Sequence, residues 1–135
     1  MSTYHSITRT NYFKVKDRET FLEFFQKVST ESGIPHLWSR DNNGEIEYAF
    51  GSEGEFYYEG TPLHDSDFAT QMQKVIPENE AVVLEEIGNE KLRYLNASAI
   101  IITSNDCVRM DFLDVLIGKT KSILQDDSFA CDMEY

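Results

Sequence analysis

Apolar and polar residues follow one another along this chain in patterns that change between strand-like and helical spacing. The segment 7–15 is rich in β-branched and aromatic residues and predicts a first strand. Apolar side chains then recur at helical spacing from Phe21 to Val28. Asp17 precedes them and can accept hydrogen bonds from the free N–H groups of a helix start, and Gly33-Ile34-Pro35 is predicted to end the helix.

Three short strands are predicted next. Segments 37–40 and 45–50 flank Asp41-Asn42-Asn43-Gly44, in which the Asn-Gly pair tolerates the positive φ angles of a tight turn. These segments therefore predict a β-hairpin. Residues 55–58 have strand-like composition and predict the third strand.

Two helices are predicted in the second half of the chain. Asp65 or Ser66 can cap the first of them, and Pro77 ends it. The second carries an apolar stripe from Phe112 to Leu124. The tail 126–135 is predicted either to be loose or to add an edge strand.

Two longer strands are predicted between these helices. They cover residues 81–87 and 92–103, and the turn between them is expected at 88–90 because Gly88 lies there. Residues 97–102 are apolar on both faces of the strand, which indicates a central position in the sheet.

The order of the predicted elements is β-α-β-β-(β)-α-β-β-α. Strands joined by hairpins, with amphipathic helices between them, favour an α+β fold. We expect a two-layer sandwich in which helices cover one face of a mostly antiparallel sheet, either ferredoxin-like or a related arrangement. No repeat or linker divides residues 1–135, so a single domain is predicted, and its other sheet face is left for solvent or a partner.

The charge of the chain lies almost entirely in its middle. The 135 residues hold 24 acids and 12 lysines and arginines, for a formal net charge of −12. Residues 1–40 sum to +2 and residues 91–135 to −2, while residues 41–90 hold thirteen acids and one base. An acidic chain is unsuited to bind phosphate groups or anionic lipid, so direct nucleic-acid binding and membrane docking are not expected.

Strand alternation predicts that the acids of the middle segment gather on one face of the sheet. Glu45 and Glu47 share one side of their strand, and Glu53, Glu55 and Glu59 share one side of the next if Gly54 does not break it. Two aspartates in the following turn extend the patch, and one tyrosine lies among the carboxylates. The predicted partner-binding set is Glu45, Glu47, Glu53, Glu55, Tyr57, Glu59, Asp65 and Asp67.

Such a patch has two main interpretations. Like charges opposite each other on a sheet cost roughly 0.2–1 kcal/mol per pair, so a row of acids without lysine or arginine lowers stability. The first interpretation is that these acids only keep the protein soluble. The second is a surface for a strongly basic partner, whose limiting form is a mimic of DNA that occupies a nucleic-acid groove.

The chain carries no recognisable catalytic, metal-binding or cofactor signature. His5, His36 and His64 are scattered, and neither Walker A nor Rossmann glycine patterns occur. Cys107 and Cys131 are expected to be reduced thiols. With no signal-peptide pattern and no apolar stretch long enough for a bilayer, we expect a cytoplasmic protein that is not an enzyme and holds no metal or cofactor.

Three segments form a recognisable set, namely Arg9-Thr10-Asn11-Tyr12-Phe13-Lys14-Val15 followed by Asp17, then Tyr48-Ala49-Phe50-Gly51-Ser52, then Glu90-Lys91-Leu92-Arg93-Tyr94. The set resembles a group of small acidic proteins carried by phages and integrated elements of Gram-positive bacteria. Its motifs look structural, and the resemblance supplies no active site. It implies a genomic context in which small acidic proteins often counter restriction enzymes or CRISPR effectors by occupying nucleic-acid-binding surfaces.

The leading hypothesis from the sequence is therefore a non-enzymatic inhibitor in the cytoplasm of a bacterial host cell. It would bind a basic, nucleic-acid-binding host protein through the acidic face, in an anti-CRISPR or antirestriction role. The alternative is a regulatory or assembly module whose sheet forms a homodimer, with the acids serving only solubility. A third reading is an enzyme that uses clustered carboxylates to hold a divalent cation.

Overall fold

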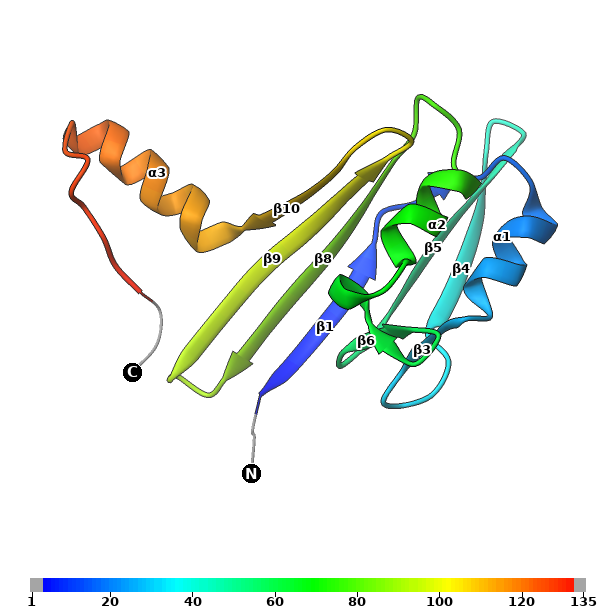
Figure 1. Cartoon of the computed structure of the whole chain (residues 1–135), viewed down its shortest axis with the longest axis horizontal. Helices are drawn as coiled ribbons and strands as arrows, with labels where there is room; N and C mark the ends of the chain where they lie inside the picture. The colour runs from blue at the N-terminus through cyan, green and yellow to red at the C-terminus, as the bar shows by residue number, and fades with distance from the viewer. Residues whose placement is uncertain (1–3, 133–135) are drawn as a thin grey trace.

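The computed structural model describes residues 4–132 as an α+β protein built around an antiparallel sheet of seven strands (Figure 1). The strands of this large sheet are β1 (His5–Thr10), β2 (Phe13–Lys14), β4 (His36–Asn42), β5 (Glu45–Glu53), β8 (Ala81–Glu90), β9 (Tyr94–Thr103) and β10 (Cys107–Asp111). A small sheet holds β3 (Val28–Thr30), β6 (Phe56–Tyr58) and β7 (Thr61–Pro62). The helices are α1 (Arg18–Phe25), α2 (Phe68–Val75) and α3 (Phe112–Leu124), with a 3-10 turn, η1 (Leu63–Asp65), before α2.

The first strand of the chain lies in the middle of the large sheet. The strand order is β10-β9-β8-β1-β5, and each neighbouring pair is antiparallel. β2 continues the line of β1 along one side of β5, and β4 pairs with the other side. Asn11, at the break between β1 and β2, donates from its side chain to the Ala81 carbonyl (3.0 Å) and accepts from the Val83 N–H (2.8 Å). These two hydrogen bonds hold the segment between β1 and β2 against β8.

An aromatic core lies between the large sheet and the layer formed by α1, α2 and the small sheet, which lie on the near side of the large sheet in Figure 1. Phe21 of α1 packs on Tyr48 of β5 with ring centroids 4.9 Å apart. Phe50 meets Phe68 of α2 in an edge-on contact. We call the face of the large sheet that is turned away from α1 and α2 the open face.

The start of the first helix is predicted correctly, but its end is not. Asp17 caps α1, and its carboxylate accepts the Thr20 N–H at 2.9 Å. The helix ends at Phe25, and Val28 belongs to β3 instead of the helical stripe. β3 pairs with β6, a strand about thirty residues away in the chain, so helical spacing gives no sign of it.

Two hairpins use residues with positive φ angles. Asn43 (φ 56°) and Gly44 (φ 90°) join β4 to β5, which confirms the predicted hairpin. Asp41 strengthens this turn by accepting the Gly44 N–H at 2.7 Å. Glu59 (φ 51°) and Gly60 (φ 81°) form a second two-residue turn, between β6 and β7, which was not predicted.

The turn expected at 88–90 is wrong. β8 runs through this segment to Glu90, and β9 begins at Tyr94. At Gly88 the N-terminal segment comes very close to β8. A Cβ atom there would lie 2.3 Å from the Tyr4 hydroxyl oxygen and 2.8 Å from the His5 carbonyl oxygen. The glycine therefore lets the N-terminal strand pack against β8.

The predicted cap of the second helix is half right. The Ser66 hydroxyl accepts the Phe68 N–H at 3.2 Å, whereas Asp65 lies in η1. The helix ends at Val75, just before Pro77, as expected.

The third helix forms where the apolar stripe predicts it, but none of its residues is buried. α3 extends beyond the edge of the large sheet, away from α1 and α2 (Figure 1). It follows β10, an edge strand that the pattern did not predict. Residues 126–132 form no strand, and the rest of the predicted tail lies outside the described residues. Within residues 4–132, no helix is long and apolar enough to cross a bilayer.

Candidate functional site

The acids of the middle segment do not form one sheet face, so that prediction is wrong. Gly54 takes a φ angle of +85° and ends the line of β5. β5 lies in the large sheet, whereas β6 lies in the small one. Glu45 and Glu47 are therefore in a different sheet from Glu55 and Tyr57.

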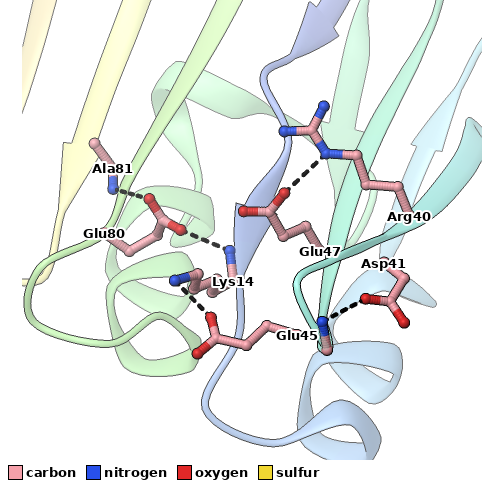
Figure 2. A network of polar contacts seen from close by, with 8 residues as sticks. Lys14, Arg40, Asp41, Glu45, Glu47, Glu80 and Ala81 are labelled. Carbon is pink, nitrogen blue, oxygen red and sulfur yellow. Dashed lines mark hydrogen bonds and ion pairs between the residues drawn. The ribbon is translucent and has the colours of Figure 1, made fainter.

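Glu45 and Glu47 are held in ion pairs (Figure 2). Lys14 contacts Glu45 at 2.5 Å, and this contact raises the pKa of the lysine. Arg40 donates to Glu47 at 2.8 Å, and this hydrogen bond lowers the pKa of the glutamate. Glu47 is only 6% exposed. These two acids hold neighbouring strands together and offer little free charge to a partner.

Three further contacts extend this network. Glu80 accepts the Lys14 N–H at 2.7 Å and the Ala81 N–H at 2.9 Å, which joins β2 to the start of β8 (Figure 2). The Arg40 guanidinium lies 4.2 Å from the centre of the Tyr12 ring, a cation–π contact. The acids at this end of the sheet therefore have structural partners.

The remaining predicted acids gather around the small sheet. Glu53 ends β5, Glu55 directly precedes β6, Glu59 lies in the β6–β7 turn, and Asp65 and Asp67 lie between η1 and α2. All five are exposed, and Tyr57 points outward beside them, because its neighbours in β6 are buried. One more exposed acid joins them from the turn after β3. We call this set the acidic layer: Glu31, Glu53, Glu55, Tyr57, Glu59, Asp65 and Asp67.

The tyrosines of β6 report a negative field in the acidic layer. Burial raises the pKa of Tyr57, and the carboxylates of Glu55 and Glu31 raise it further. Burial likewise raises the pKa of Tyr58, with added effects from Glu59 and Asp67. Burial is the larger cause of both shifts, and the carboxylates add to it because a nearby negative charge disfavours the phenolate.

The acidic layer contains almost no compensating positive charge. Between Glu53 and Asp67 the chain has five acids and neither lysine nor arginine. Within residues 4–132, its only ion pair joins Asp65 to His64 at 3.3 Å, and the histidine counts as a cation only when protonated. The charge of this layer therefore faces solvent.

Glu31 is a member of the acidic layer that the sequence analysis missed. Its carboxylate oxygen lies 4.0 Å from the position that a Cβ atom would take at Gly54, between Glu53 and Glu55. Glu31 reaches this place because β3 pairs with β6. It lies outside the acidic segment 41–90, and β3 was not predicted, so no local signal pointed to it.

The open face of the large sheet carries both charged and apolar side chains. Strand alternation places Glu45, Glu47 and Glu53 of β5 on it, together with Arg9 and Glu85. The same alternation places Ile7, Ile87, Leu95, Val108 and Met110 there, and all five are exposed. Three of the predicted acids, Glu45, Glu47 and Glu53, therefore lie on the open face, whereas Glu55 and Glu59 belong to the small sheet and its turn.

A cleft of about 400 Å³ separates the acidic layer from the covered side of β8 and β9. Tyr4 donates to Glu86 at 2.7 Å at its rim, and Asn96 donates to both groups. Burial is the main reason that the pKa of Tyr4 rises to about 12. Across the cleft, Asp114 and Arg109 belong to the last helix and strand.

The described residues show no arrangement suited to metal binding. Within residues 4–132, no three His, Cys, Asp or Glu side chains are grouped to hold an ion. Cys107 and Cys131 are exposed and not joined in a disulfide.

No protein-family model matches this chain, and no curated protein or solved structure matches it either. The resemblance to acidic phage proteins therefore stays a prediction, and the argument for function rests on the surfaces described above.

Proposed function

We propose that this protein is a non-enzymatic inhibitor that binds a basic, nucleic-acid-binding host protein through its acidic layer. The observation that carries this proposal is a group of exposed carboxylates around the small sheet, most of them from the segment Glu53 to Asp67, which has neither lysine nor arginine. An ordinary surface mixes charges of both signs, since this lowers repulsion. An unmixed acidic surface is suited to a partner that supplies the missing cations.

Such binding would use the same charge pairing that a protein uses to bind the phosphate backbone of a nucleic acid. A nucleic-acid-binding groove presents lysines and arginines that pair with anions, and carboxylates can occupy the same positions. Tyr57 adds an aromatic ring beside Glu55, whose carboxylate its hydroxyl contacts at 3.4 Å. Tyrosine is enriched among the residues that contribute most to protein interfaces. Complementary charge speeds association and makes it sensitive to salt.

Relative to the sequence hypothesis, the binding set changes in two ways. Glu45 and Glu47 leave it because they are paired with Lys14 and Arg40, and Glu31 enters it. We propose an anti-CRISPR or antirestriction role in the cytoplasm of a bacterial host, as the resemblance implies.

We also infer that the fold is a ferredoxin-like arrangement extended by β9 and β10. The element order β1-α1-β4-β5-α2-β8 and the strand order β8-β1-β5-β4 support this inference. The alternative function, a homodimeric assembly module, is compatible with an exposed acidic layer if the dimer contact lies elsewhere.

The test compares two charge-reversed variants with the same net charge. Glu55→Lys/Glu59→Lys changes the acidic layer, and Glu78→Lys/Glu85→Lys changes exposed acids outside it. Wild-type protein, immobilised at low salt, should retain a nucleic-acid-binding protein from a bacterial host lysate and release it as salt rises. The acidic-layer variant should bind this protein at least about tenfold more weakly, whereas the control variant should keep most of its affinity.

Duplex DNA provides a second readout, because a mimic and DNA compete for one groove. Added duplex should displace the captured protein from the wild type. Equal retention by both variants, or capture that duplex DNA does not affect, would count against the proposal.

A further inference from the structure

The C-terminal part of the chain leaves an unusual amount of apolar surface uncovered. We call β10 and α3 the apolar arm. All five residues of β10 are exposed, and none of the thirteen residues of α3 is buried. α1 and α2 have only eight residues each, yet each buries three of them. α3 is longer than α1 and α2, so its length does not explain its exposure.

Two apolar stripes run along α3. At 100° per residue, Leu113 and Ile117 lie on one stripe, and both are half-buried. Phe112, Leu116 and Ile123 lie on another stripe about 100° away. Their exposed fractions are 54%, 39% and 70%. A helix that is apolar around much of its circumference is normally buried, and an isolated helix of this length is marginal in water.

β10 adds an open strand edge to the apolar arm. It pairs with β9 on one side only. Val108 and Met110 are exposed on it. Unpaired edges are usually protected by charge, proline or a covering element, because they pair readily with other strands. The charged residues of β10, Arg109 and Asp111, lie by strand alternation on the opposite face from Val108 and Met110.

The accessible surface of the chain is larger than that expected of a compact monomer of the same mass. The chain exposes 9040 Å². A compact monomer of 15.6 kDa is expected to expose about 7,300 Å². The six residues outside the described part account for at most about 1,000 Å² of the difference. Roughly 800 Å² remains, which is about the area that each partner buries in a standard interface.

The charge of the apolar arm favours a second copy of this chain as the occupant. From Cys107 to Leu124 the arm holds two acids and three bases, so its net charge is +1. The arm differs in this respect from the acidic segment 41–90. A twofold interface brings the same surface from both partners together, so each surface must complement itself. A nearly neutral, mixed-charge apolar surface meets that condition, and an acidic one does not.

We propose that the apolar arm forms a symmetric dimer with a second copy of this chain, through the stripe of Phe112, Leu116 and Ile123 and the adjoining edge of β10. The contact lies on α3 and β10, whereas the acidic layer lies around the small sheet. The proposed dimer contact therefore uses residues other than those of the acidic layer. It is independent of the proposed inhibitor function and differs from the sheet-mediated homodimer considered in the sequence analysis.

Sedimentation velocity over a concentration series tests the dimer. The wild type should sediment with about twice its 15.6 kDa mass. Leu116→Glu/Ile123→Glu should give a monomer, because it would place four carboxylates in a twofold apolar contact. A second variant, Met110→Glu on β10, should weaken the dimer through the strand edge. The acidic-layer variant Glu55→Lys/Glu59→Lys serves as the control and should remain dimeric.

Circular dichroism and thermal unfolding check that each variant is folded, since the changed side chains are exposed in the monomer. A wild type that remains monomeric at high concentration would overturn the proposal. So would a folded Leu116→Glu/Ile123→Glu variant that remains dimeric. Neither result depends on the partner-capture experiment, so failure of the dimer and failure of the inhibitor proposal can be distinguished.

Discussion

Glutamates in this protein act in different ways, according to the residues that fold against them. Glu47 is buried and paired with Arg40, so its charge is used within the sheet. Glu86 accepts hydrogen bonds from Tyr4 and Asn96 at the rim of the cleft. Glu55 is exposed in the acidic layer and forms no ion pair within residues 4–132. Only the last of these roles leaves a charge free to attract a partner.

Tyr4→Phe should change how stability depends on alkaline pH. Burial, with the hydrogen bond to Glu86, raises the pKa of Tyr4 from 10.0 to about 12. The folded state holds this proton more tightly than the unfolded chain, so the stabilisation is complete below pH 10 and is lost as pH rises toward 12. Over that range the wild type should lose about 1 kcal/mol more unfolding free energy than the variant, because solvent screens part of the effect at this half-buried group.

Urea unfolding of both proteins at several pH values measures this difference. Below pH 10 the variant should be the less stable of the two, by about 1 kcal/mol, because it lacks the hydrogen bonds of the hydroxyl. If the unfolding free energies of the two proteins changed in parallel from neutral to alkaline pH, the Tyr4 hydroxyl would not contribute to the loss of stability at alkaline pH.

At the scale of elements, glycine has different effects in a strand and in a helix. Gly51 of β5 lies opposite Arg9 of β1, and a Cβ atom there would be 2.7 Å from the Arg9 Cβ. Gly118 lies within α3, where an added Cβ atom would meet nothing within 4 Å. The same residue type therefore permits close strand packing at one site and only weakens a helix at the other.

Alanine substitutions at these two glycines should have opposite effects. Gly51→Ala should destabilise the protein by about 1–3 kcal/mol, because the sheet must move apart to admit a methyl group. Gly118→Ala should stabilise α3 by about 0.5–1 kcal/mol, because alanine is the better helix former. Denaturant unfolding measures both changes. If the Gly51→Ala variant were more stable than the wild type, β1 and β5 would not be packed as closely at Arg9 as described here.

At the scale of the whole molecule, the acidic layer and the apolar arm lie on different elements. The acidic layer surrounds the small sheet, whereas exposed apolar side chains lie on the open face and the apolar arm. Residues 1–40 and 91–135 together have no net charge, so the −12 of the chain comes from the middle segment. Repulsion within that segment opposes folding and can be screened by salt.

Thermal stability should therefore rise with ionic strength. Screening over about 10 Å at 0.1 M salt weakens the repulsion among the carboxylates of the acidic layer. The melting temperature of the wild type should increase as potassium chloride is added, and that of Glu55→Lys/Glu59→Lys should increase less. Scanning calorimetry at several salt concentrations tests this, and equal salt dependence in the two proteins would show that the repulsion lies elsewhere.

The sequence by itself determined features that depend on a few neighbouring residues. The Asn43-Gly44 hairpin, the Asp17 cap of α1 and the bounds of α3 follow from local conformational preference and spacing. The α+β class and the outward positions of Glu55 and Tyr57 follow in the same way, because strand alternation is local.

The tertiary structure decided what depends on pairing between distant segments. Glu45 meets Lys14 across thirty-one residues of chain, and β3 brings Glu31 to the acidic layer by pairing with β6. Local periodicity shows on which side of a strand a residue lies, but not which strand or sheet will be its neighbour. For this reason the sequence located the charge of the protein, and only the fold separated the acids that hold strands together from those that face solvent.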